Sequence, residues 1–272
     1  MFISDEELEK YLRNFLKKLQ GVEGRFDIYN QVERESRTVY VDPITGDDNN
    51  GNGSASAPFA TIQKAIASIK RIIPPNVSIT IQLGPNDGST TRTFALTETV
   101  KIEGFTGGGF LIIKGDNVDE TASSSKLIVV DGTGLNNHIF WLKLNNIQIT
   151  IKAIKIVVDT SLGWWAGINV RGRSNWASIH YCAIEGKDNS QGYCIMAVHG
   201  AWIDVKNCYI SNAKNGLFAD FGSDIISREN YSYGTYPSNA LSAWKQSRIA
   251  KVGNQPVGSA NNEISGSGGE IE

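Results

Sequence analysis

Short alternations of apolar and polar residues fill the chain from Val77 onward, and glycine, asparagine, aspartate and serine separate them. An alternation with a period of two predicts β-strands that bury one face. Two segments are closely similar, NWASIHYCAI at 175–184 and AWIDVKNCYI at 201–210, offset by 26 residues. The similarity continues forward at offsets of 22 and 24 residues, and backward at an offset of 30 residues, which pairs Ile149 with Ile179. This repeat predicts an all-β fold, a right-handed single-stranded parallel β-helix with two or three short strands per coil.

The same alternation predicts which residues form columns along the stacked coils. A second strand of each coil places Ile168, Ile195, Leu217 and Leu241 in one inward column. The residues between inward positions face outward. The outward columns predicted for the first strand are Asn146, Trp176, Trp202, Asp224 and Arg248, and Gln148, Ser178, Asp204, Ile226 and Ala250. Those predicted for the second strand are Asn169, Met196, Phe218 and Ser242, and Arg171, Val198, Asp220 and Trp244.

One further column indicates a side-chain stack at a corner of the coil, formed by Cys182, Cys208, Asn230 and Asn254. The three cysteines of the chain have no metal-binding or redox spacing, so we expect buried, reduced thiols. The longest connection between strands carries Trp164 and Trp165, which we expect to project on a loop.

Two helices are predicted before the repeats begin. Residues 59–72 carry apolar side chains on one side, and two prolines follow them, so we expect a helix that caps the open end of the β-helix. Residues 4–20 form a separate amphipathic helix with a heptad-like seam. That seam consists of Leu8, Leu12, Phe15 and Leu19. Because a lone short helix is marginal in water, it needs a partner: its own body, further copies of itself or a neighbouring protein. This divides the chain into 1–38, a segment for attachment or oligomerisation, and 39–272, the β-helix.

Composition and charge narrow the possible functions. The net charge of −2 provides no electrostatic attraction for nucleic acid or an anionic membrane, and no apolar run reaches the roughly 18 residues of a membrane span. The acidic, amphipathic N-terminus is not a signal peptide, so synthesis in a cytoplasm is expected. No motif for a cofactor or a metal is present. The run from Asp47 to Asn52 is rich in oxygen ligands but lacks the spacing and closing glutamate of a calcium loop.

Several segments resemble a known family. The opening VYVDPITGDDNNGNGSASAPFATIQKAI is similar to that of pectate-lyase-like β-helix proteins. The segments TETVKIEGFTGGGFLIIKGD, GLFADFGSDI and ALSAWKQSRIAKVGNQPVGS resemble the β-helices of phage and prophage tail proteins, tailspikes and tail fibres. This resemblance implies a homotrimer in a virion tail, joined to other tail or baseplate proteins through the N-terminal helix. The resemblance indicates little about catalytic activity, because proteins with this fold include lyases, hydrolases, binding proteins and inert rods.

The outward aromatic residues indicate a contact surface, since an exposed Trp leaves a large apolar area in water. Trp176 and Trp202 should stack about 5 Å apart on adjacent coils. Three interpretations stay open for the outward aromatic residues: packing under a segment of the same chain, a trimer interface, or stacking platforms for sugar rings. The outward apolar residues Met196 and Phe218 favour an interface.

The case for catalysis depends on acidic residues. Asp204 and Asp224 lie on adjacent coils and are the alternative candidates for a carboxylate pair that hydrolyses glycans. Arg248 follows Asp224 in its column, and a surface ion pair explains that aspartate equally well. His180 and His199 stand alone and favour satisfied polar roles. We therefore expect a structural or host-adhesion subunit of a phage-like tail that binds cell-surface glycan or neighbouring tail proteins. A polysaccharide-degrading enzyme, a hydrolase or lyase, is the alternative.

Overall fold

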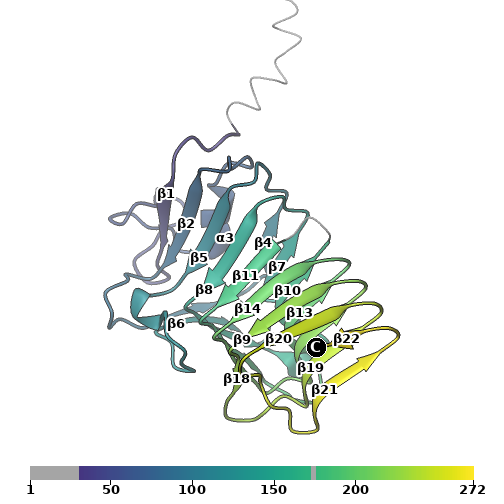
Figure 1. The fold of residues 1–272 in the computed structure, drawn as a ribbon. Helices are drawn as coiled ribbons and strands as arrows, with labels where there is room; N and C mark the ends of the chain where they lie inside the picture. Colours follow the sequence, from purple (N-terminus) through teal and green to yellow (C-terminus); the bar gives the residue numbers. More distant parts are fainter. Residues whose placement is uncertain (1–30, 173–175) are drawn as a thin grey trace, which may run out of the picture.

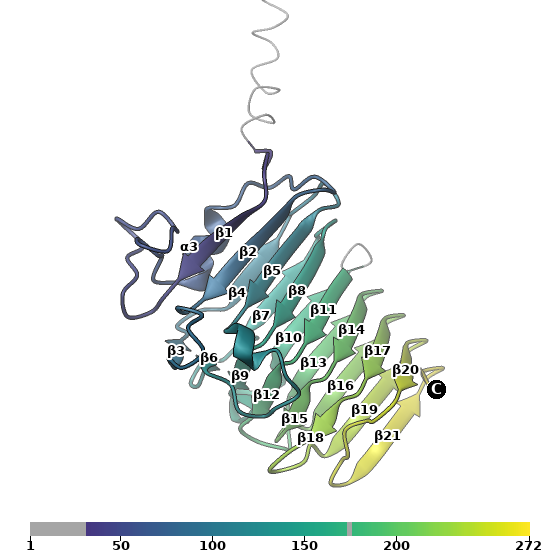
Figure 2. The ribbon, with the colours of Figure 1, turned by 60° about the vertical axis from the view of Figure 1, so that its left-hand side comes forward.

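The computed structural model describes residues 31–172 and 176–272, in which β-strands run in three parallel sheets. Each strand pairs with the equivalent strand of the next coil, so the sheets form the walls of a rod (Figures 1 and 2). The predicted all-β parallel β-helix is therefore confirmed at this level. The predicted helix at 4–20, with Leu8, Leu12, Phe15 and Leu19, lies outside the described residues.

The elements are named by sheet. The nine-stranded sheet contains β1 (Arg37–Val41), β2 (Ser78–Leu83), β5 (Phe110–Lys114), β8 (Gln148–Lys152), β11 (Trp176–His180), β14 (Trp202–Lys206), β17 (Asp224–Arg228), β20 (Arg248–Val252) and β22 (Glu270–Ile271). The seven-stranded sheet contains β4 (Val100–Glu103), β7 (Phe140–Lys143), β10 (Ala166–Arg171), β13 (Tyr193–Val198), β16 (Asn215–Asp220), β19 (Asn239–Trp244) and β21 (Asn261–Gly266). The six-stranded sheet contains β3 (Arg92–Ala95), β6 (Ile128–Gly132), β9 (Lys155–Val158), β12 (Ala183–Gly186), β15 (Tyr209–Ser211) and β18 (Tyr231–Ser232). The helices are α3 (Ile62–Ala67) and the short 3₁₀ turns η1 (Asn117–Asp119) and η2 (Thr160–Leu162).

The register of the strands confirms most of the predicted columns. Trp176, Trp202, Asp224 and Arg248 are paired in succession, and so are Asn169, Met196, Phe218 and Ser242. The backward extension is wrong by two residues, because Ile151 pairs with Ile179, and Gln148 precedes Trp176 in its column. Isoleucine occupies every second position from 147 to 151, so the apolar alternation is unchanged by a shift of two residues.

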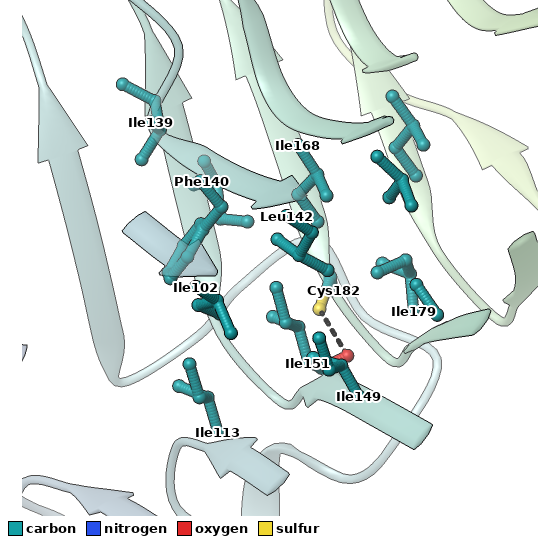
Figure 3. Close-up of a cluster of buried hydrophobic side chains, with 14 of the residues drawn as sticks. Ile102, Ile113, Ile139, Phe140, Leu142, Ile149, Ile151, Ile168, Ile179 and Cys182 are labelled. Carbon is teal, nitrogen blue, oxygen red and sulfur yellow. Dashed lines mark hydrogen bonds between the residues drawn. The ribbon is translucent and has the colours of Figure 1, made fainter. Parts of the chain in front are cut away.

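The core fills the interior of the coils. Side chains from the nine-stranded sheet, such as Ile113, Ile151 and Ile179, meet side chains from the seven-stranded sheet, such as Ile102 and Leu142 (Figure 3). All five are fully buried. Burial of each such side chain contributes roughly 1.5–3 kcal/mol, so the stability of the rod comes from stacked coils and not from any single coil.

Two corners of the coil are made by residues in the left-handed conformation. One corner follows the nine-stranded sheet, where Ala153, Tyr181, Asn207 and Glu229 have φ of 59°, 54°, 53° and 48°. The other follows the seven-stranded sheet, where Leu144, His199, Phe221 and Lys245 have φ of 54°, 61°, 53° and 48°. A non-glycine residue in this conformation costs roughly 1–2 kcal/mol, so the stacked strands must enforce these turns.

The predicted corner column lies just after the first of these turns. Cys182 and Cys208 are fully buried, and the Cys182 thiol lies 3.6 Å from the carbonyl of Ile151 (Figure 3). Asn230 is also fully buried. Its amide nitrogen donates to Val205 O at 3.0 Å, and its side-chain oxygen accepts from Cys208 N at 2.9 Å. The cysteines therefore have the structural role that the sequence predicts.

A second asparagine ladder was not predicted. Asn239 donates from its side chain to Asn215 at 3.1 Å, and Asn261 donates to Asn239 at 2.9 Å. These residues begin strands of the seven-stranded sheet, and Ser242 donates to Asn215 at 2.8 Å. The ladder satisfies buried amide groups from coil to coil. The repeated spacing of the three asparagines was the signal available in the sequence.

The capping helix is shorter than predicted. Residues 59–72 were expected to be helical, whereas α3 spans Ile62–Ala67 and packs against β1, β2 and β4 at one end of the rod (Figure 2). Beyond it, Ile72 forms parallel bridges with Val32 and Thr106. Backbone pairing with two neighbouring segments therefore replaces the last helical turns. The contact also brings the chain before residue 39 onto the body.

We expect that replacing Asn230 with alanine lowers the free energy of unfolding by about 3 kcal/mol, because Cys208 N–H and the Val205 carbonyl each lose a buried partner. Urea denaturation measures this change. Asn254→Ala, at the exposed end of the same column, is the matched control and should cost less than about 1 kcal/mol. Equal losses in the two variants would contradict the role assigned to the buried position.

Candidate functional site

An exposed pair of tryptophans lies on the outer face of the nine-stranded sheet. Trp176 and Trp202 project from paired positions on β11 and β14, and their ring centroids are 4.6 Å apart with an interplanar angle of 67°. Trp176 is 52% exposed and Trp202 is half-buried. The sequence predicted this adjacency, although the rings meet edge to face instead of stacking in parallel. The pair leaves apolar ring surface open to a ligand.

This outer face has three columns that run along the rod. The first contains Ser78, Phe110, Gln148, Trp176, Trp202, Asp224 and Arg248. The middle column contains Thr38, Thr80, Ile112, Thr150, Ser178, Asp204, Ile226 and Ala250. The third contains Tyr40, Gln82, Lys114, Lys152, His180, Lys206 and Arg228. Aromatic side chains therefore border one side of a middle column with several small hydroxyl residues, and basic side chains border the other.

Both candidate catalytic carboxylates on this face are paired with basic groups. Asp204 Oδ1 lies 3.0 Å from Arg228 Nε, an ion pair without hydrogen-bond geometry, and its other oxygen lies 3.4 Å from His180 Nε2. Asp224 forms an ion pair with Arg248 at 3.2 Å. The ion pair between Asp224 and Arg248 that the sequence suggests is therefore present. Each of the two carboxylates has a basic partner within the chain.

The outer face of the seven-stranded sheet carries an aromatic cluster. Tyr193 lies between Trp164 and Phe218, with ring centroids 5.9 Å and 4.7 Å away. Lys214 places its ammonium group 4.6 Å from the Trp164 ring, and Trp164 is 49% exposed. Phe218 and Met196 are paired in register and half-buried. The chain itself therefore covers part of this surface, as one of the three interpretations anticipated.

A buried histidine supports the loop that carries Trp164 and Trp165. His138 Nδ1 accepts a hydrogen bond from Ala166 N at 2.9 Å, so in the neutral ring the proton is on Nε2. His138 Nε2 lies 2.9 Å from the side-chain amide of Asn169, and the amide oxygen is the group able to accept this proton. The ring also makes edge contacts with Trp141 and Trp165. Burial, with a smaller contribution from the charge of Arg171, lowers the pKa of His138 to about 4.

Two further predicted residues have structural partners. Asp220 accepts from Phe221 N and forms an ion pair with Lys245 at 3.2 Å. Trp244 is half-buried and lies directly over Gly266 of the next coil, where a β-carbon would be 2.3 Å from the indole ring. Neither side chain is therefore a free binding group.

The left-handed corner of the seven-stranded sheet holds a stack that the sequence analysis missed. The His199 and Phe221 rings stack 4.8 Å apart, and the Lys245 ammonium group lies 3.7 Å from the Phe221 ring centroid. His199 therefore does not stand alone, and neither does His180, which contacts Asp204. Phe221 is still 48% exposed, so these contacts cover only part of its ring.

The polar loop and the thiols have no reactive arrangement. Asp48 Oδ1 accepts from Ala60 N and Thr61 N, which fixes the start of α3, and Asp47 closes its own turn with Asn49 and Asn50. Within residues 31–172 and 176–272, no group of three or more His, Cys, Asp or Glu side chains is placed to hold a metal ion. Burial raises the pKa of the Cys194 thiol to about 12, so this cysteine is inert.

Comparison with known proteins identifies no relative, since no family model, curated protein or solved structure matches the chain. No helix in the described part of the chain is long and apolar enough to cross a membrane.

We expect the stability of the protein to fall as the pH is lowered from 6.5 to 4, because of His138. The pKa of His138 is lowered in the folded state from 6.5 to about 4, so in this window only the unfolded chain takes up the proton. The contribution to the free energy of unfolding is about 3 kcal/mol, present above pH 6.5 and lost towards pH 4. Urea denaturation of the wild type and of His138→Gln at several pH values measures it.

The His138→Gln variant should show a smaller loss of stability between pH 6.5 and pH 4 than the wild type. His199→Gln removes an exposed histidine and is the matched control. A flattened pH profile in the control, or an unchanged profile in His138→Gln, would contradict the assignment.

Proposed function

We propose that this protein is a non-catalytic adhesion rod that binds cell-surface glycan along the outer face of its nine-stranded sheet. The observation that carries the proposal is the exposed pair Trp176 and Trp202, which lies beside a column containing hydroxyl side chains. Aromatic rings bordered by a few polar groups are a common arrangement in ligand sites. The proposal includes a right-handed β-helix, since parallel crossover connections are right-handed in about 98% of cases.

The energetics of the tryptophan pair support a binding role. A Trp side chain buries roughly 150–250 Å² when fully covered, at about 25 cal/mol for each Å². With Trp176 52% exposed, covering the rest of it would contribute about 2–3 kcal/mol. Because Trp176 lies outside the core, its aromatic ring contributes little to the stability of the folded rod. A ligand that covers the ring supplies the missing contact.

The paired acids support adhesion over cleavage. Asp204 and Asp224 lie on adjacent strands, offset by two positions along them, so their placement alone suits a hydrolase. Both carboxylates already contact a basic side chain of the chain itself, Asp204 with Arg228 and Asp224 with Arg248, so neither is held ready for a substrate. A glycan held on this face would therefore be bound and not cut.

We further propose that the rod acts as a homotrimer in a phage-like virion tail, with the segment before residue 39 joined to other tail or baseplate proteins. The support is the resemblance of the sequence and the apolar groups along the seven-stranded sheet, where Trp164 and Leu144 are 49% and 64% exposed. Exposed apolar patches commonly mark protein interfaces. Three copies would raise the avidity of a shallow glycan site without any new contact.

We expect Trp176→Ala to weaken glycan binding about thirtyfold, the effect of losing a central aromatic anchor worth about 2 kcal/mol. Binding is measured on an array of bacterial surface glycans and then by calorimetry with the best ligand. Val257→Ala is the matched control, because it removes an exposed apolar side chain that lies beside β18 of the six-stranded sheet. It should bind like the wild type.

Two results would overturn the proposed binding role. The first is the absence of any bound glycan on the array. The second is the release of reducing ends from the bound glycan, abolished by Asp204→Asn or Asp224→Asn, which would show that this face belongs to an enzyme.

We expect sedimentation equilibrium of the full chain at micromolar concentration to give the mass of three copies. The exposed apolar surface at Trp164 is covered in the proposed trimer, so Trp164→Ser should shift the equilibrium towards the monomer. Thr80→Ser, on the opposite outer face, is a conservative control. A wild-type monomer at that concentration would contradict the trimer.

A further inference from the structure

A column of basic side chains runs along the nine-stranded sheet beside the tryptophan pair. Lys114, Lys152, His180, Lys206 and Arg228 occupy paired positions on five consecutive strands. Neighbouring strands lie about 4.8 Å apart, so the column extends over roughly 19 Å along the axis of the rod. We call these five residues the basic column.

The basic column is unfavourable for the rod alone. Like charges directly opposite one another on adjacent strands are destabilising. Two carboxylates offset part of the charge: Glu120, from the loop after β5, lies 2.9 Å from Lys152 and 3.5 Å from Lys114, and Asp204 contacts His180 and Arg228. Each of these carboxylates is shared by two basic groups, which leaves an excess of positive charge.

Lys206 is the clearest sign of this excess. It lies between His180 and Arg228 in the column, on the same strand as Asp204. Asp204 is directed to those two neighbours, and Lys206 has no acidic partner in residues 31–172 and 176–272. An unpaired cation flanked by basic groups is a site that an external anion would occupy.

The basic column ends in a cavity. The cavity has a volume of about 420 Å³ and lies over β1, β2, β5 and β8, where Lys114 and Lys152 form part of its wall. The rest of the lining offers mainly hydroxyl and amide groups, from Thr38, Tyr40, Thr80, Gln82 and Asn86. A volume of this size falls in the range of small-molecule sites, and the lining matches the hydroxyl groups of a sugar.

We propose that the nine-stranded sheet binds an acidic glycan, a chain of sugars that carries carboxylate or sulfate groups. The chain lies along the basic column with its anions facing Lys114, Lys152, Lys206 and Arg228, and one sugar enters the cavity. Trp176 and Trp202, on the other side of the middle column, contact ring faces of the same chain. This inference rests on the proposed glycan-binding function and names the class of glycan.

The geometry favours a glycan over a nucleic acid. The basic groups form a single file on one face, and the net charge of the whole chain is −2. Domains that bind nucleic acid are commonly basic overall, with a pI above about 9, whereas the pI of this chain is about 6.0. The hydroxyl and amide lining of the cavity suits sugar hydroxyl groups, which an acidic glycan repeats along its length.

The test compares two polymers with the same backbone, dextran sulfate and neutral dextran, and adds hyaluronan as a carboxylated chain. Calorimetry with the full chain should detect binding of dextran sulfate, of hyaluronan or of both, but no comparable binding of dextran. The affinity should fall steeply as salt is raised from 50 to 300 mM, since exposed charges are screened. A single-stranded oligonucleotide, added as a competitor, should not displace the glycan.

The decisive variant is Lys206→Gln, because this side chain has no acidic partner to leave unpaired. It should weaken binding of the charged polymer about fivefold, the usual effect of one surface cation facing an anionic surface. The thermal midpoint should stay the same or rise, since repulsion in the column falls. Lys155→Gln, which removes a cation that pairs with Glu185 on the six-stranded sheet, is the matched control and should bind like the wild type.

Glu120→Gln tests the opposite change, an increase in the positive charge of the basic column. It removes the carboxylate that offsets Lys114 and Lys152, so the affinity for the charged polymer should increase. Equal binding of dextran and dextran sulfate would overturn the acidic-glycan inference and leave the proposed function standing. Unchanged affinity in Lys206→Gln, or displacement by the oligonucleotide, would also overturn it. Failure of every glycan on the array would overturn the proposed function itself.

Discussion

The in-register pairing of parallel strands from coil to coil is the interaction on which the rest of this structure depends. Between β2 and β19 each coil contributes one strand to each sheet and lies about 4.8 Å from the next, so every position is repeated above and below by its equivalent. The pairing of Trp176 with Trp202 and of Ile179 with Val205 follows from the same register. Inward positions then build a continuous apolar core, and the corners must turn at the same place in every coil. Left-handed residues such as Tyr181 and Phe221 are tolerated because the flanking strands enforce the turn.

The same register turns outward residues into linear arrays along the outer faces of the rod. Asp204 lies between His180 and Arg228 of the neighbouring strands, so part of its charge is offset within the chain. Trp176 is exposed, and Lys206 has no acidic partner in the described part of the chain, so these are the groups that we propose for ligand contact. The proposed surface would bind along its length with many modest contacts, so its affinity would depend on ligand length, ionic strength and the number of copies.

The columns could be predicted from the sequence wherever the repeat of apolar and turn residues fixes the register. From β10 onward, apolar columns and turn residues repeat at nearly constant spacing, and the sequence alone placed Trp176, Trp202 and Asp224 in one column. Before β11 the alternation of isoleucines is unaffected by a shift of two residues, so Gln148 was missed as the neighbour of Trp176. The basic column was invisible for the same reason, because its first members lie on β5 and β8. Glu120 could not be foreseen either, since it comes from a loop that the repeat does not describe.

The stability of the rod comes from its core, whereas the repulsion between like charges lies on its outer face. The proposed binding surface can therefore carry this repulsion without unfolding the rod. Fully buried side chains such as Ile113 and Ile151 and ladders such as Asn215 with Asn239 hold the coils without help from the outer face. A core of this kind tolerates repulsion between stacked cations of about 1 kcal/mol or less for each pair in water. A row of like charges is compatible with a stable fold only where the stabilisation from the core exceeds that repulsion. The excess charge along the basic column is then free to respond to an anion, and the affinity for that anion includes the relief of repulsion that the folded rod carries.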